Sequence, residues 1–184
     1  MKKSIRKSIA GIWILASVTA VSGVEPVRPD PGGSPPPPLV LRPDAMVREE
    51  TRGTFVGNDI YNQTGASQSV ATRIARGTTR AFSVRLQNDG NTKDSFLLKP
   101  SGPPSPHFTV TYWQNGKNIT STVVAGKFAT SDLAPRQSLT LLVKVSAKTT
   151  ATAGSFIRQP LTMVSQKSPN LKDTVVILSK LATN

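Results

Sequence analysis

A chain of 184 residues has room for one ordinary domain and its appendages. Its 23 Lys and Arg outnumber its 10 Asp and Glu and give a formal charge of +13, which attracts anionic surfaces. The absence of cysteine excludes disulfides, thiolate metal sites, a cysteine nucleophile and a lipid anchor on cysteine.

The first 23 residues follow the plan of a secretory signal peptide. A basic stretch at 1–7 precedes an apolar run at 9–21, and the small residues Ala20 and Gly23 offer two cleavage points. The apolar run is too short for a comfortable membrane span, although an uncleaved anchor helix is the alternative. We therefore expect residues 1–23 to be a signal peptide, with no stable transmembrane anchor left after cleavage. The protein would then be extracellular, periplasmic or at the cell surface.

Residues 24–43 form a proline-rich linker. Proline removes an amide donor and fixes φ, which prevents helices and central strands. The prolines at 35–38 predict polyproline II, a semi-rigid spacer, and a docking site for a proline-reading domain is the alternative. We expect 24–43 to be a disordered linker and 44–184 to be the folded domain.

From residue 44 onward, short apolar segments alternate with turn signals, as in an all-β chain. This pattern predicts an antiparallel immunoglobulin-like β-sandwich of about seven to nine strands. The predicted strands are 45–50, 54–61, 69–74, 80–87, 95–99, 108–113, 139–146, 156–165 and 174–181. The clearest alternation places Phe82, Val84 and Leu86 on one face, which predicts a sheet buried on one side. No stretch has a helical period with caps.

Two turn signals predict hairpins. Asp89-Gly90, within residues 88–91, supplies a dipeptide that tolerates positive φ. Asn115-Gly116 provides a second such dipeptide. A proline turn at 134–137 precedes the strand predicted at 139–146.

Four segments resemble a class of bacterial extracellular immunoglobulin-like domains, the CARDB-type and NPCBM-associated domains. These segments are residues 85–91, 94–96, 133–135 and 154–156, and the resemblance spans about 54–181. The family combines an Asn-x-Gly turn, a Leu-Ala-Pro-Gly turn before a long strand, and a final hairpin that opens at Gly. The resemblance implies a spacer, adhesive or accessory domain without shared catalytic residues. Arg136 stands where the family usually has Gly, so we expect a turn without positive φ there.

Tyr112 and Trp113 are adjacent and therefore face opposite sides of a strand. One ring is expected in the core, and an exposed partner could stack on sugars. Burial and support of the core is the favoured interpretation for the pair.

Arg73, Arg76, Arg80 and Arg85 are spread over two predicted strands and the turn between them. If these strands pair, the four side chains form one solvated basic face that attracts an anionic envelope polymer or polysaccharide. Lipid head groups are a further anionic partner of this kind, and ordinary solubility explains the charge more simply still. We expect no nucleic-acid partner, because aromatic residues are not interleaved with the basic ones and the chain is exported.

Candidate catalytic and metal sites have little support. The single histidine, His107, has no second titratable group implied beside it, so a surface role is favoured over catalysis. Asp89 and Asp94 superficially resemble a calcium loop, but a full loop needs more oxygen ligands, and Lys93 opposes a cation. The oxygen-rich residues 57–62 are interpreted as a strand bent at Gly57. We predict no catalytic residue, cofactor site or metal site.

These observations predict a non-enzymatic secreted or cell-envelope module with a structural, adhesive or spacer role. The alternative is a carbohydrate-binding module accessory to an enzyme on another chain. A cell-envelope protein or an anionic polymer is the expected partner, and the oligomeric state is left open.

Overall fold

The computed structural model describes residues 34–183. The predicted signal peptide at 1–23 and the first part of the linker lie outside the described residues. No helix between residues 34 and 183 is both long and apolar enough to cross a membrane. The folded unit begins at Pro37.

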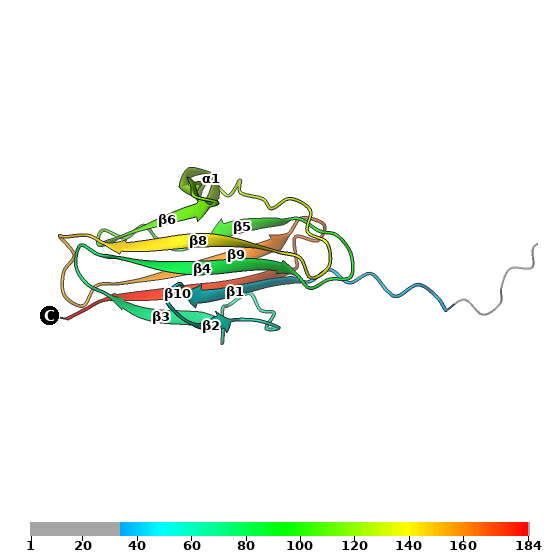
Figure 1. The fold of residues 1–184 in the computed structure, drawn as a ribbon, viewed down its shortest axis with the longest axis horizontal. Helices are drawn as coiled ribbons and strands as arrows, with labels where there is room; N and C mark the ends of the chain where they lie inside the picture. The colour runs from blue at the N-terminus through cyan, green and yellow to red at the C-terminus, as the bar shows by residue number, and fades with distance from the viewer. Residues whose placement is uncertain (1–33, 184) are drawn as a thin grey trace, which may run out of the picture. The chain divides into compact units, whose positions relative to one another are not determined.

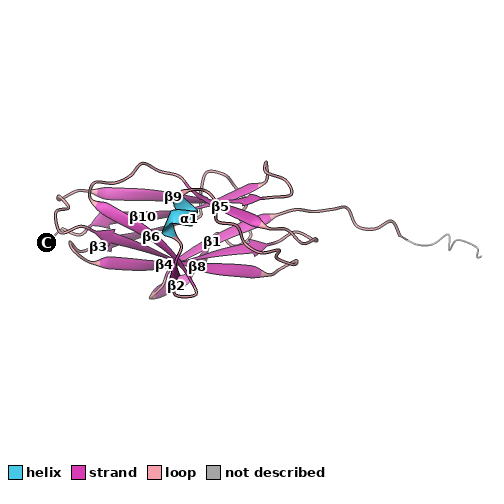
Figure 2. Cartoon of the chain, turned by 90° about the horizontal axis from the view of Figure 1, so that it is seen from above, coloured by secondary structure: helices cyan, strands magenta, loops and turns pink. Residues whose placement is uncertain are grey.

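The folded unit consists of two β-sheets packed face to face (Figures 1 and 2). The six-stranded sheet has the order β2 (Arg52–Val56), β1 (Pro43–Glu49), β4 (Thr79–Asn88), β8 (Ser138–Ala147), β6 (Phe108–Gln114) and β7 (Lys117–Asn118). The four-stranded sheet has the order β3 (Ser69–Ile74), β10 (Lys172–Leu181), β9 (Phe156–Ser165) and β5 (Phe96–Pro100). Neighbouring strands are antiparallel, except that β3 and β10 are parallel. This arrangement confirms the predicted all-β, immunoglobulin-like sandwich.

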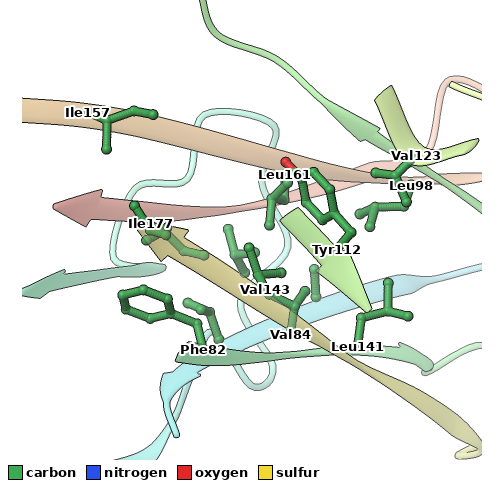
Figure 3. Close-up of a cluster of buried hydrophobic side chains, with 14 of the residues drawn as sticks. Phe82, Val84, Leu98, Tyr112, Val123, Leu141, Val143, Ile157, Leu161 and Ile177 are labelled. Carbon is green, nitrogen blue, oxygen red and sulfur yellow. The ribbon is translucent and has the colours of Figure 1, made fainter. Parts of the chain in front are cut away.

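The core lies between the two sheets, where the predicted alternation places it. Phe82, Val84 and Leu86 on β4 are fully buried and face inward. In the cross-strand register, Phe82 lies opposite Val143 of β8, which lies opposite Tyr112 of β6, so these side chains share the inner face (Figure 3). The buried ring of Tyr112 confirms that one member of the aromatic pair belongs to the core.

The strand predicted at 54–61 is too long. β2 ends at Val56, and a turn follows in which the Ile60 amide donates to the Gly57 carbonyl at 3.0 Å. Gly57 has a φ of +107°, and a Cβ there would lie 2.6 Å from the Ala45 carbonyl oxygen. The chain therefore leaves the sheet at a position that only glycine can occupy.

The hairpin predicted at residues 88–91 is wrong, because β4 and β5 belong to different sheets. Neither Asp89 nor Gly90 has positive φ. Glycine is needed instead for close approach, since a Cβ on Gly90 would lie 2.5 Å from the Val40 carbonyl oxygen. This connection pairs with the segment that leads into β1. The Asn91 amide donates to the Val40 carbonyl and the Asp89 amide donates to the Arg42 carbonyl, both at 2.9 Å.

The turn at Asn115-Gly116 is confirmed. Both residues have positive φ, 49° and 77°, and Gln114 pairs with Lys117 across the turn, as in a type I′ hairpin.

The turn at 134–137 differs from the expectation, because Arg136 has a φ of 66° despite its side chain. The Gln137 amide donates to the Ala134 carbonyl at 2.9 Å, which closes the turn. The Arg136 amide also donates to the Asn88 carbonyl at 2.6 Å. These hydrogen bonds hold the turn in a conformation that arginine alone does not favour.

The short strand β7 and the single-turn helix α1 (Thr120–Val124) were not predicted from the sequence. The helix has no side-chain cap, and four of its five residues are valine or threonine, which have low helix propensity. Tertiary contacts fix it: Thr120 Oγ1 accepts the Tyr112 amide at 2.9 Å, and Val123 is buried in the core. Helix propensity therefore gave no signal for α1.

The fully buried carboxylate of Asp173 joins the two sheets at the side where β1 runs beside β10. It accepts hydrogen bonds from the Ala45 amide at 2.6 Å, the Gln68 Nε2 at 2.7 Å and the Asn62 amide at 3.0 Å. Burial raises the pKa of Asp173, and these donated hydrogen bonds oppose the rise.

Candidate functional site

The basic and aromatic residues predicted as a ligand surface do not form one surface. Arg73 lies on β3, while Arg80 and Arg85 lie on β4 in the other sheet, and Arg76 lies in the connection between the two strands. Because β3 and β4 do not pair, the expected single basic face does not form. Arg80 instead approaches Glu49, with 3.8 Å between Nε and Oε1.

Trp113 lies on the outer face of the six-stranded sheet, and a cation lies over one face of its ring. The Nζ of Lys144 lies 4.5 Å from the ring centroid, a cation–π contact. The indole Nε1 donates to Thr111 Oγ1 at 3.0 Å. A sugar stacking on this ring face would have to displace Lys144, so the geometry gives the carbohydrate-binding alternative little support.

Phe55 forms a second aromatic–cation cluster on the same outer face. Its ring centroid lies 4.1 Å from the Arg85 guanidinium carbon and 4.8 Å from that of Arg48. Aromatic and basic side chains are therefore interleaved here, contrary to the expectation from sequence. The carboxylate of Glu50 accepts the Ser83 hydroxyl on this face, so the face carries both signs of charge.

The outer face of the four-stranded sheet has one sign of charge only. Five exposed basic side chains alternate along its strands with inward-facing core residues. They are Arg73, Lys99, Arg158, Lys172 and Lys180, and we call them the basic face. Asp173 is the single acidic residue in these four strands, and it is buried.

The register of the sheet brings like charges together on the basic face. Lys180 lies directly opposite Arg73 in the parallel β10–β3 pair, and neighbouring strands are about 4.8 Å apart. Like charges in directly opposed positions destabilise a sheet. Within residues 34–183 the sole ion pair joins Arg80 to Glu49, so no carboxylate neutralises the basic face. The arrangement produces a positive potential that an anionic ligand would relieve.

A shallow groove of about 300 Å³ lies at one end of the basic face. Lys99 and Lys172 line it together with Gln63, Ser101 and Thr162. The hydroxyl oxygens of Thr162 and Thr174 are 2.9 Å apart beside it. Two ammonium groups, hydroxyls and a side-chain amide are the donors that bind an oxyanion.

Of the five basic-face residues, Arg73 alone is among the candidates predicted from the sequence. The other four lie on β5, β9 and β10, far from Arg73 along the chain, so no local motif links them. The alternation of side chains along a strand was an available signal. It places Arg158, Lys172 and Lys180 on the face opposite to the apolar face of their own strands.

The structure separates the two carboxylates considered for a calcium loop. Both oxygens of Asp94 accept hydrogen bonds from the protein, from the Ser95 amide and the Ser165 hydroxyl. Asp89 instead accepts the Gln87 side-chain amide at 2.7 Å. In the part of the chain that the structure describes, no group of three or more His, Asp or Glu side chains is placed to hold a metal ion.

A small acidic cluster surrounds Tyr61 at the end of the sandwich that holds residues 57–62. The Tyr61 hydroxyl lies 3.0 Å from Asp59 Oδ1 and 2.9 Å from Asp89 Oδ2. Beneath it, Asp44 is fully buried and its Oδ1 has no hydrogen-bond partner in the structure. Burial, followed by the charge of Asp89, raises the pKa of Asp44 to about 7.

His107 precedes β6 and is half-buried. Its backbone carbonyl accepts the Lys148 amide at 2.9 Å, and its own amide donates to Ser105 Oγ at 3.2 Å. Both contacts use the backbone of His107 and assign no role to its imidazole.

No family model and no curated protein matches the chain. Several solved structures are similar to it. One, described as a FixG-related protein from Vibrio parahaemolyticus, is 10% identical, with 78% of this chain and 100% of that chain covered and a TM-score of 0.44. A PapD-like domain of human CEP192 is 12% identical, with 77% and 87% covered and a TM-score of 0.39.

A family 123 glycoside hydrolase from Clostridium perfringens is 6% identical, with 77% of this chain and 28% of that chain covered and a TM-score of 0.45. Likenesses at these identities and TM-scores assign neither a family nor an activity. The two sheets themselves define the class of the protein, an immunoglobulin-like β-sandwich. The narrower resemblance to CARDB-type domains stays a prediction.

Proposed function

We propose that this chain is an exported, non-enzymatic binding and spacer module that attaches to anionic polymers of the cell envelope through its basic face. The observation that carries the proposal is the composition of that face, which has five exposed cations and no exposed acid.

Electrostatics favours this ligand class. Residues 34–183 contain 18 Lys and Arg and 8 Asp and Glu, a net charge of +10, so attraction extends beyond the face itself. A polyanion that neutralises the face releases its condensed counterions, which supplies affinity without a shaped pocket. It also relieves the repulsion between Lys180 and Arg73.

The spacer role is supported by the course of the chain. β1 and β10 run in the same direction, so the chain enters the sandwich at the end where β1 begins and leaves it at the far end of β10 (Figure 1). The ten residues of β10 span roughly 33 Å. A proline-rich linker before such a unit holds the basic face away from the point where the linker is attached.

Export is tested separately from binding, by determining the N-terminus of the mature chain. Mass spectrometry of the chain recovered from culture medium or periplasm should find a mature N-terminus at Val21 or Val24, following cleavage after Ala20 or Gly23. Recovery of the intact chain with the membrane fraction would favour the uncleaved anchor instead.

Binding is tested with dextran sulfate and neutral dextran, which share one backbone. We expect the purified chain to bind dextran sulfate and not dextran. The triple variant Arg73→Gln/Lys180→Gln/Arg158→Gln should bind at least tenfold more weakly. A matched control, Arg52→Gln/Lys117→Gln/Lys127→Gln, removes the same charge from exposed positions outside the basic face and should stay within twofold to threefold of the wild type.

Equal weakening of both triple variants would contradict the proposed site, because net charge alone would then explain binding. Binding to neutral dextran together with a change in Trp113 fluorescence would favour the carbohydrate-binding alternative.

A further inference from the structure

The sandwich is open on the side between β6 and β9. The outer edge of β6 is paired by β7 at Trp113 and Gln114 alone. In the other sheet, β5 covers β9 from Leu161 to Ser165, and the first part of β9 has no strand on that side. Two strand edges therefore face each other across this opening.

The free edge of β6 presents main-chain groups at Val110. The Tyr112 carbonyl accepts the Ile119 amide and the Tyr112 amide donates to Thr120 Oγ1, both at 2.9 Å, so the polar groups of Tyr112 point away from β8. Residues two apart on a strand direct their hydrogen-bonding groups to the same side. The amide and carbonyl of Val110 therefore point outward, and no partner outside the sheet binds them in the described chain.

An apolar groove of about 420 Å³ lies between these two edges. Phe108, Tyr112 and Ile157 contribute its apolar lining, and Pro103 and Pro104 lie on the loop that borders it. The ring of Tyr112 extends from β6 toward β9 across the interior at this point (Figure 3). The volume lies at the lower end of the range for ligand pockets and fits one or two large side chains.

The positive charge at the groove favours an acidic occupant over a second copy of this basic unit. Among residues 34–183, Lys148 is the only charged side chain that lines it, and it is exposed. A second copy of this folded unit would bring another net charge of +10 to the same place. An extended segment with a carboxylate beside its apolar side chains fits both the apolar lining of the groove and the positive charge of Lys148.

We infer that this groove binds an extended acidic and apolar segment of another protein, which adds to the free edge of β6 as a short strand. Its backbone bonds the amide and carbonyl of Val110, a large apolar side chain enters the groove beside Tyr112 and Ile157, and its carboxylate pairs with Lys148. This is strand addition, in which main-chain hydrogen bonds give affinity and a side-chain pocket gives specificity. The inference does not depend on polymer binding at the basic face, which lies on the opposite sheet surface.

The test begins with a phage-displayed library of random 12-residue peptides selected on the purified chain. We expect enriched peptides with alternating apolar residues next to Asp or Glu. Fluorescence anisotropy with the most enriched peptide then compares variants. Lys148→Glu should weaken binding at least fivefold, while the matched control Lys127→Glu, outside the groove, should change it less than twofold.

A second variant tests strand addition itself. Val110→Pro removes the outward amide without removing a hydrogen bond to β8, so the sheet should persist while peptide binding falls at least tenfold. Circular dichroism checks its fold, and Val110→Thr, which keeps the amide, should bind within threefold of the wild type.

Several results would overturn the inference. They are a library that yields no enriched sequence, peptides without acidic residues, equal binding to the two lysine variants, or a dimer in light scattering that Val110→Pro dissociates. Acidic peptides could also bind the basic face, so peptide affinity is measured on the Arg73→Gln/Lys180→Gln/Arg158→Gln variant, where it should be retained. Loss there would place the peptide on the basic face and refute the groove.

Discussion

The side chain of Asn88 joins segments that are distant in the sequence. Its Nδ2 donates to the Thr92 carbonyl at 2.7 Å and to the Leu133 carbonyl at 2.8 Å, and its Oδ1 accepts the Gly90 amide at 3.0 Å. The Asn-x-Gly and Leu-Ala-Pro motifs, which are separate in the sequence, therefore form one hydrogen-bonded unit.

We expect Asn88→Ala to lower the free energy of unfolding by about 2–4 kcal/mol, because it removes three hydrogen bonds made by a fully buried side chain. Urea denaturation followed by fluorescence measures the change. Asn170→Ala, at an exposed position, serves as the control and should be within about 0.5 kcal/mol of the wild type. A small effect of Asn88→Ala would mean that water replaces its side chain.

Asp44 should make stability depend on pH. Its pKa in the folded state is raised to about 7 from an ordinary value of 3.8, so between these values the folded protein binds more protons than the unfolded one. Stability should therefore fall as pH rises from 4 to 7. The loss is roughly 1.4 kcal/mol for each unit by which the two pKa values differ.

Comparison with Asp44→Asn isolates this contribution, because Asp173 also has a raised pKa and remains in both proteins. We expect the variant to gain stability relative to the wild type as pH rises from 4 to 8, measured by urea denaturation at each pH. Parallel stability profiles would show that Asp44 keeps its ordinary pKa.

At the scale of elements, the same dipeptide chemistry leads to two different structures. Asn115-Gly116 closes a hairpin because β6 and β7 are neighbours in one sheet. Asp89-Gly90 instead joins strands of different sheets and packs against the chain that leads into β1. A turn dipeptide identifies where the chain changes direction. Whether the connection is a hairpin or a crossing between sheets depends on which strand the next strand pairs with.

Gly90→Ala should weaken the pairing of residues 40–42 with residues 89–91, because a Cβ would lie 2.5 Å from the Val40 carbonyl oxygen. We expect a cost of about 1–3 kcal/mol and faster hydrogen exchange at the Asp89 and Asn91 amides. Gly126→Ala is a control for general destabilisation, because its φ of +67° strains alanine there while a Cβ on Gly126 meets no atom within 4 Å. It should leave exchange at both amides unchanged, and unchanged exchange in Gly90→Ala would contradict the packing argument.

At the scale of the whole molecule, charge is distributed unevenly between the two outer surfaces. The six-stranded sheet stacks its cations on Phe55 and Trp113 and includes Glu50, whereas the basic face has no aromatic stack and no acid. Cations that are already stacked or paired release less energy on meeting a polyanion, so the basic face should dominate binding.

The salt dependence of dextran sulfate binding should report the number of basic-face contacts. The slope of log affinity against log salt concentration should become shallower by roughly two to three in the Arg73→Gln/Lys180→Gln/Arg158→Gln variant. Titrations at several salt concentrations measure it. An unchanged slope would mean that these three side chains do not contact the polymer.

The sequence by itself determined the all-β class, most of the strands and the side of each strand that is buried. These properties are local, because a period of two and a turn dipeptide can be read within ten residues. Phe82, Val84 and Leu86 were assigned to the core on this basis. The helix α1 was not predicted, because its conformation depends on contacts with Tyr112 and the core and not on the helix propensity of its own residues.

Only the tertiary structure decided which strands are neighbours, and with them the candidate binding surfaces. The closeness of Arg73 and Arg85 in the sequence predicts one shared face, but the strand order places them in different sheets. Arg73 and Lys180 are far apart in the sequence and lie side by side. Strand pairing depends on long-range hydrogen bonding and on core packing between the sheets, and no local pattern of residues encodes either.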